Sequence, residues 1–187
     1  MLVLAWCLVA LISPFFVGRW PAGLFLNRWR MPWLIWLVVV AQGLVIGLKM
    51  PHGLAATLHV ATYVAAVAFL WLNRHFPGVY FVGAGALSNG VVIALNGGTL
   101  PASAAAVARA GLTDHGDFAN SAVLENPVLL WLGDVFAWPA PLPLANTFSV
   151  GDVLIVVGAF VAAWSGARRF GEADPELVPG ATPEATP

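Results

Sequence analysis

The sequence predicts an all-α integral membrane protein, a bundle of about five transmembrane helices with a long extracytoplasmic segment before the last helix. Of its 187 residues, 60% are apolar and 9% are charged, whereas soluble domains carry roughly 25% charged residues. Five apolar stretches come close to the roughly 17 to 25 residues that a helix needs to cross membrane hydrocarbon. Both observations argue against a water-soluble fold.

The expected helices follow one another along a membrane domain that covers residues 1–169. Helices are expected because hydrocarbon offers no hydrogen-bond partner to an unpaired backbone group. The first stretch lacks the basic leader and cleavage site of a secretory signal, so we interpret it as a retained helix. The predicted spans cover residues 1–17, 31–48, 54–72, 78–95 and 150–167. Residues 170–187 are rich in Pro, Glu, Ala and Thr, a composition typical of a disordered tail.

The distribution of cations predicts the orientation of these spans, because short loops rich in Lys and Arg stay on the cytoplasmic side. With the N-terminus outside, only Lys49 and Arg109 fall on the outer face. The C-terminus is then cytoplasmic, and the chain is expected to cross a cytoplasmic membrane several times. The cytoplasmic face receives six arginines: Arg19, Arg28, Arg30, Arg74, Arg168 and Arg169.

Small residues in two spans are predicted to mediate contacts between helices. They are Gly43 and Gly47 in the second span and the run from Gly83 to Ala86 in the fourth. Small side chains let helix backbones approach closely, which supplies the dispersion energy that lipid does not. We expect packing within the bundle in preference to dimerisation.

The segment 96–147 is external in this topology, and a loop of this length is uncommon unless it has a task. Residues 102–110 are alanine-rich and predict a short helix. Residues 128–134 are too short to span and too apolar for full exposure, so they are expected to cover the outer helix ends. Asp114, His115 and Asp117 have side chains that could hold a divalent cation, but a hydrated turn is the favoured interpretation. No metal or cofactor is predicted.

Charge and cysteine content exclude several partner classes. The net charge is −1, and no basic patch is present that could meet a nucleic-acid backbone. Cys7 is the single cysteine, so the chain offers neither a disulfide framework nor a thiolate metal site. The expected partner is the lipid bilayer, together with a lipid-linked peptide or another membrane subunit.

Two acids at the outer boundary are the candidate catalytic residues, Asp134 and Asp152. If they lie close together, their like charges separate their pKa values, and one can hold a proton while the other is ionised. The alternative for Asp152 is structural, because Ser149 followed by Asp152 before an apolar run is the pattern of a capping box. His59, inside the third span, is expected to hydrogen-bond a neighbouring helix or to handle a proton.

Three short segments resemble lipoprotein signal peptidase, the membrane aspartyl protease that removes the leader from bacterial prolipoproteins. They are Gly-Ala-Leu-Ser-Asn at 85–89, Gly-Asp-Val-Phe at 133–136 and Phe-Ser-Val-Gly-Asp at 148–152. The resemblance implies that Asp134 and Asp152 form a catalytic dyad. It also implies supporting roles for Asn89 and for Ser149, which stands where that family has Asn.

The chain also resembles an uncharacterised family of small bacterial multi-pass membrane proteins, known as a domain of unknown function and frequent in actinobacteria. The marks of this resemblance are Asn96-Gly-Gly with Pro101, Leu-Gly-Asp at 132–134, and Asn146 followed by the segment 148–152. The resemblance adds Asn96 and Asn146 to the candidate site. It implies a kinship and no activity.

Two main functions remain open from the sequence, and a small transporter or ion-coupled component is a third. Gly90 and Val91 stand where signal peptidases have Asp-Arg after the Asn. This difference favours a non-catalytic component that binds a lipid, a peptide or a partner through an outward-facing polar site. The alternative is an aspartyl membrane endopeptidase that uses Asp134 and Asp152.

Overall fold

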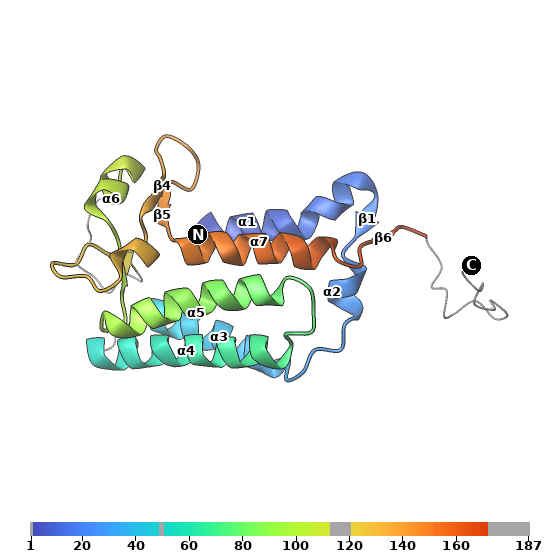
Figure 1. The fold of residues 1–187 in the computed structure, drawn as a ribbon, viewed down its shortest axis with the longest axis horizontal. Coiled ribbons are helices and arrows are strands. Elements are labelled where there is room, and N and C mark those ends of the chain that lie inside the picture. The colour runs from blue at the N-terminus through green and yellow to red at the C-terminus, as the bar shows by residue number, and fades with distance from the viewer. Residues whose placement is uncertain (1, 49–50, 113–120, 172–187) are drawn as a thin grey trace.

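The computed structural model describes residues 2–48, 51–112 and 121–171, and it is mostly helical. Five helical segments run alongside one another through the body of the molecule (Figure 1). They are α1 (Leu2–Ile12), continued by the 3-10 turn η1 (Ser13–Val17), then α3 (Trp33–Gly47), α4 (His52–Leu72), α5 (Val79–Leu95) and α7 (Val150–Trp164). Their order and approximate bounds are those expected from the apolar stretches.

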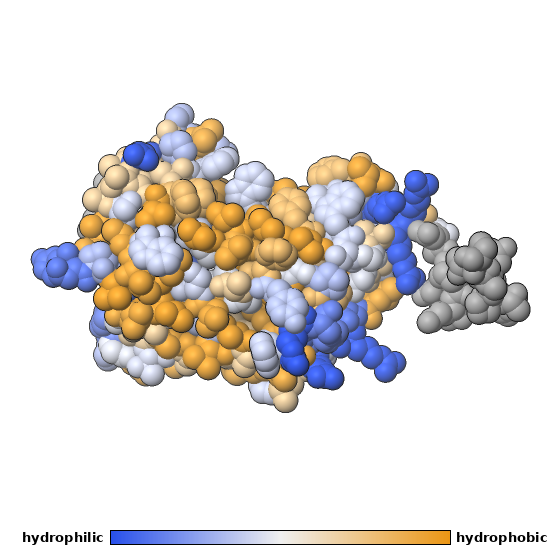
Figure 2. All heavy atoms as spheres, in the orientation of Figure 1, coloured by the Kyte–Doolittle hydropathy of each residue, from blue (hydrophilic) through white to orange (hydrophobic). Residues whose placement is uncertain are grey.

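Among the described residues, α4 is the one helix that is both long and apolar enough to cross a membrane. The other four apolar helices have between 10 and 17 residues. Large apolar side chains are exposed along the helices, including Trp36 and Val64. The face in Figure 2 is largely hydrophobic over the helices, and hydrophilic side chains gather toward the end where β1 and β6 lie.

Close backbone contact between α5 and α7 forms the centre of the bundle. A Cβ on Gly85 would collide with the backbone oxygen of Gly151 and crowd the Ile155 side chain, so this contact requires glycine. The predicted packing role therefore applies to Gly85. It is wrong for Gly43 and Gly47, where an added Cβ would meet open space, because α3 packs against α4 along another face of the helix.

The end that includes the N-terminus of α7 has a cap made of short elements (Figure 1). The cap contains β2 (Leu100–Pro101), α6 (Ala104–Ala110), β3 (Ser121–Ala122), the 3-10 turn η2 (Leu130–Leu132), β4 (Phe136–Trp138) and β5 (Asn146–Phe148). The helix expected at 102–110 is α6, which begins at Ser103, whose side chain accepts a hydrogen bond from the Ala106 N–H. Leu129 and Leu132 pack on Val92 and Ile93, so the apolar segment covers the end of α5.

The expected all-α class needs a correction, because the described residues contain three two-stranded sheets. β2 pairs with β3 in parallel, and β4 pairs with β5 antiparallel. At the opposite end of the bundle, β1 (Arg19–Trp20) pairs antiparallel with β6 (Arg168–Arg169) next to the short helix α2 (Ala22–Leu26). Strands of two or three residues are too short for the alternating pattern by which strands are predicted. The turn expected around Asp114 lies outside the described residues, as does most of the expected tail.

Candidate functional site

Asp134 is fixed in the cap by strand-like backbone contacts with the segment after β2. Its N–H donates to the carbonyl of Pro101 at 2.9 Å, and its own carbonyl accepts from the Ser103 N–H at 3.0 Å. A Cβ on the preceding residue, Gly133, would collide with the Pro101 carbonyl oxygen, so glycine is needed for this approach. Both backbone polar groups of Asp134 are therefore bonded to the same segment, in a parallel bridge with Ala102.

The Asp134 side chain is buried, with 4% of its surface exposed. Its Oδ2 accepts hydrogen bonds from the Ser121 hydroxyl at 2.6 Å and from the Thr147 hydroxyl at 3.2 Å. Its Oδ1 is buried and has no hydrogen-bond partner among the described residues. One oxygen of this carboxyl is thus anchored, while the other is left for a proton or a ligand.

The pKa of Asp134 is raised from 3.8 to about 6, mainly because burial disfavours the charged carboxylate. The hydrogen bonds from Ser121 and Thr147 oppose this rise in pKa, and the negative charge of Asp152 adds to it. The electrostatic influence of Asp152 means that the two acids interact. A carboxyl in this state can donate a proton near neutral pH.

Asp152 lies in the first turn of α7 and closes the predicted capping box. The Ser149 hydroxyl accepts from the Asp152 N–H at 3.0 Å, and the Asp152 Oδ2 accepts from the Ser149 N–H at 3.0 Å. The structural interpretation of Asp152 is therefore confirmed. A carboxylate has lone pairs for about four hydrogen bonds, so the capping box leaves both oxygens of Asp152 able to accept further hydrogen bonds.

Asn89 connects α5 to the capping box of α7. Its side-chain N–H donates to the Asp152 Oδ1 at 2.9 Å, and its Oδ1 accepts from the Ser149 hydroxyl at 3.0 Å. Asn89 and Ser149 are both buried. The side-chain orientation of Asp152 is consequently set by hydrogen bonds from two elements that are far apart in the sequence.

The pairing of β4 with β5 brings the two acids to one place. Phe136 pairs with Phe148, and Ala137 pairs with Thr147. β4 begins two residues after Asp134, and β5 leads directly into the N-terminus of α7. The antiparallel register therefore places Asp134 next to the first turn of α7, and Thr147 is close enough to bond to it.

Asp134 and Asp152 line one cavity of ≈ 380 Å³ together with residues from α1, α3, α4, α5 and the cap. Of the seven predicted site residues, the lining includes five: Asp134, Asp152, Asn89, Asn146 and His59. Ser149 supports the cavity through Asn89 and Asp152. Asn96 lies elsewhere, because its amide group exchanges two hydrogen bonds with the Val128 backbone and holds the cap to the end of α5.

Helices α4 and α3 contribute further side chains to the lining of the cavity. His59 is buried and stacks on Tyr63 with ring centroids 5.4 Å apart. Gln42 on α3 also lines the cavity, and its Oε1 accepts from the Thr62 hydroxyl at 3.2 Å. These side chains give the cavity a polar lining between apolar helices.

Four polar lining residues were not predicted from the sequence: Gln42, Tyr63, Ser121 and Thr147. Thr147 had a signal, because it comes two residues before the predicted cap Ser149 in the segment that leads to Asp152. Ser121 had none, since its position depends on the parallel pairing of β2 with β3. Gln42 and Tyr63 read as ordinary members of apolar helices.

Comparisons with known proteins find one matching family and one curated relative. A family model described as a family of unknown function, DUF5317, matches residues 26–164. A protein of Thermotoga maritima, named only as an uncharacterized protein, is 34% identical over 95 residues, which are 50% of this chain. The match spans about half of that relative, 54% of its length. No solved structure matches the chain significantly.

Proposed function

The chain belongs to the DUF5317 family of unknown function, and we propose that it is an aspartyl hydrolase of a bacterial cytoplasmic membrane. In this proposal, Asp134 and Asp152 cleave an amide or ester bond in a lipid-linked or membrane-anchored peptide. One observation carries the proposal: the two acids line the same cavity, and one of them is buried with a raised pKa. A buried carboxyl with a raised pKa beside a second carboxyl is the kind of arrangement that acid–base hydrolysis uses.

The proposal includes a bundle that crosses the membrane five times, through the segment 2–17 and through α3, α4, α5 and α7. The 21 residues of α4 extend about 32 Å, close to the thickness of membrane hydrocarbon. The 15 residues of α3 and of α7 extend about 22 Å, a difference that local thinning of the bilayer accommodates. The apolar side chains exposed on the helices support this arrangement.

The orientation of the bundle follows from the charges at its two ends. The connections at the end with β1 and β6 include Arg19, Arg74 and Arg169, and the cap at the other end includes Asp134 and Glu125. Because Arg-rich short loops stay in the cytoplasm, we place the cap outside and both β1 and β6 inside. The site then faces outward, at the level of the outer helix ends.

The proposed reaction divides the work between the two acids. Hydrogen bonds from Asn89 and the Ser149 N–H stabilise negative charge on Asp152, and so does the positive end of the α7 dipole. Ionised Asp152 accepts a proton from water as the water oxygen adds to the substrate carbonyl carbon. Protonated Asp134 donates a hydrogen bond to the carbonyl oxygen. As the tetrahedral intermediate collapses, the bond to the leaving nitrogen or oxygen breaks, and that atom takes the proton from Asp152.

The experiment measures incorporation of ¹⁸O from water into hydrolysis products, called ¹⁸O exchange below, because the substrate need not be known in advance. The purified full chain is reconstituted with lipids and membrane peptides extracted from its native membranes, in water enriched in ¹⁸O. Mass spectrometry should find new carboxylates that carry ¹⁸O with the wild-type chain, and none with Asp134→Asn or Asp152→Asn. Glu125→Gln, which removes an exposed acid outside the cavity, is the matched control and should retain the exchange.

A second function is favoured by one observation, namely that both oxygens of Asp152 already accept structural hydrogen bonds. In this alternative the cavity binds a lipid, a peptide or a partner subunit and cleaves nothing. The same reconstitution distinguishes the two functions. A wild-type chain that retains a native peptide or lipid through purification and yields no labelled carboxylate would support binding and would contradict hydrolysis.

A further inference from the structure

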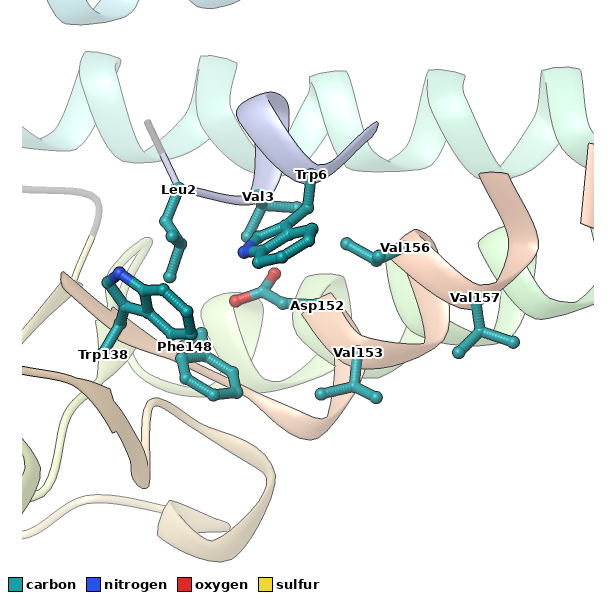
Figure 3. A pocket seen from close by; sticks show the side chains of 9 residues that line it. All are labelled: Leu2, Val3, Trp6, Trp138, Phe148, Asp152, Val153, Val156 and Val157. Atoms are coloured by element: carbon teal, nitrogen blue, oxygen red, sulfur yellow. The ribbon is translucent and has the colours of Figure 1, made fainter. Parts of the chain in front are cut away.

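An apolar groove leads away from the acids along the contact between α1 and α7. It has a volume of ≈ 200 Å³, and one of its walls consists of Leu2, Val3 and Trp6 on α1. The facing wall belongs to α7, where Val156 and Val157 continue the line beyond Asp152 (Figure 3). Asp152 is the only charged side chain in the lining, which is otherwise apolar.

The groove adjoins the polar cavity, because Val3 and Asp152 line both. At the end near the cap, Trp138 and Phe148 form part of the lining, and the rings of Trp6 and Trp138 meet edge to face with centroids 5.9 Å apart. An occupant that fits both spaces has a polar, cleavable group in the cavity and an apolar chain in the groove. A straight hydrocarbon chain attached to a polar head group has this chemistry.

The apolar groove between α4 and α5 shares Tyr63 with the cavity but has no charged side chain in its lining, and another apolar groove does not reach the cavity at all. It lies between α3 and α4, is lined by residues such as Val38 and Phe69, and has a volume of ≈ 260 Å³. Its lining includes no polar side chain and shares no residue with the polar cavity. Nothing distinguishes an occupant of that groove from bulk lipid, whereas the α1 groove ends at a carboxyl of the candidate site.

We propose that α1 is a specificity element, which forms with α7 a groove for one hydrocarbon chain of the substrate and so positions the cleavable bond beside Asp152. The inference rests on the proposed hydrolysis only for the chemistry at the head of that chain. α1 lies outside residues 26–164, the region that the family model matches. The α7 wall of the groove lies within that region.

Photo-crosslinking tests the groove with a neutral probe, an N-palmitoyl glycinamide that carries a diazirine halfway along its chain. The full-length protein is irradiated with the probe in detergent micelles, and mass spectrometry locates the adducts. We expect adducts concentrated on α1 and α7. Val156→Trp fills the groove and should lower their yield about tenfold, while Val38→Trp, the same exchange in the α3–α4 groove, should leave the yield unchanged.

A second pair of variants protects the test against misfolding of Val156→Trp. Trp6→Ala removes one wall of the groove and should lower the adduct yield on α7, whereas Trp36→Ala, at a tryptophan of α3 that is 71% exposed, should not. Labelling spread evenly over α3, α4 and α7, or insensitive to both groove variants, would overturn the inference.

The two experiments distinguish failure of the groove proposal from failure of the proposed hydrolysis. Asp134→Asn should retain groove labelling while losing ¹⁸O exchange. If the wild-type chain shows groove-specific labelling but no exchange, the chain site stands and the proposed hydrolysis is wrong. If exchange is present and labelling is nonspecific, the hydrolysis stands and α1 selects no chain.

Discussion

Asp134 shows how a buried acid can be held by hydrogen bonds, with no ion pair to another residue that the structure describes. Its backbone is fixed between Pro101 and Ser103, and one carboxyl oxygen is fixed by Ser121 and Thr147. The neutral form of the carboxyl satisfies this site better than the charged form, because two hydroxyl donors do not replace the hydration of a full charge. The raised pKa is the consequence.

The raised pKa of Asp134 predicts that stability decreases as the pH rises. In the unfolded chain this acid releases its proton near 3.8, and in the folded chain near 6. Its stabilising contribution is therefore complete below pH 3.8 and is lost as the pH passes through 6. The contribution of Asp134 to the free energy of unfolding should fall by up to about 1.4 kcal/mol per pH unit in this window.

Chemical unfolding in detergent micelles at several pH values measures this effect. The difference in unfolding free energy between the wild type and Asp134→Asn should change along that slope between pH 4 and pH 6, because Asn does not titrate. A difference that is constant across the window would mean that Asp134 titrates normally in the folded protein.

At the scale of single residues, the sequence identified the two acids as candidates for the site. It also predicted the capping role of Asp152, because a capping box is a local pattern of four residues. It could not predict which hydroxyls bond to Asp134. Ser121 reaches the acid through a parallel strand pair, and Thr147 through an antiparallel one. Pairings of two or three residues leave no periodic signal in a sequence. The catalytic role of the acids stays a prediction.

Among the elements, the contact of α5 with α7 determines whether the site exists. Asn89 on α5 reaches the cap of α7 only because Gly85 and Gly151 let the helices approach closely. The sequence predicted that small residues in this helix would be used for packing. It could not decide between this run and Gly43 with Gly47, because a small-residue spacing does not reveal which face of a helix has a neighbour.

A matched pair of substitutions checks this assignment. Gly85→Ala adds a methyl group that collides with the backbone of α7, and overpacking of this kind should lower the free energy of unfolding by about 1 to 3 kcal/mol. Gly43→Ala adds the same group where there is open space, and it should be neutral or stabilising by up to about 1 kcal/mol. Thermal unfolding in detergent compares the two. An equal loss in both would show that the α5–α7 contact is not tight.

At the scale of the whole molecule, the helices, including α6 in the cap, were predictable, and the strand pairs of the cap were not. Long apolar stretches predict helices strongly, and each of the five became one in the expected order. The family prediction is confirmed as a family of unknown function, whereas the resemblance to signal peptidase stays a prediction. The strand pairs join segments that are separated in the chain, such as Leu100 with Ser121 and Arg19 with Arg169, and no local pattern specifies them.

The proposed topology predicts which end of the molecule is accessible from outside the cell. Cys7 is the sole cysteine, so a Cys7→Ala background allows single cysteines to be placed at will. In intact cells, a membrane-impermeant maleimide should label Leu142→Cys, between β4 and β5, and should spare Phe170→Cys, after β6; both positions are exposed. A permeant maleimide serves as the control and should label both. Labelling of Phe170→Cys alone would reverse the topology.

The pKa of Asp134, measured with and without its proposed partner, tests the pairing of the two acids most directly. Carbon-13 NMR of the aspartate carboxyls in micelles can follow this titration in the wild type, in Asp152→Asn and in the control Glu125→Gln. Because the charge of Asp152 raises the pKa of Asp134 from across the cavity, we expect a value of about 6 in the wild type, a lower one in Asp152→Asn, and no change in Glu125→Gln. An Asp134 pKa that is the same in all three proteins would contradict the pairing on which the proposed hydrolysis depends.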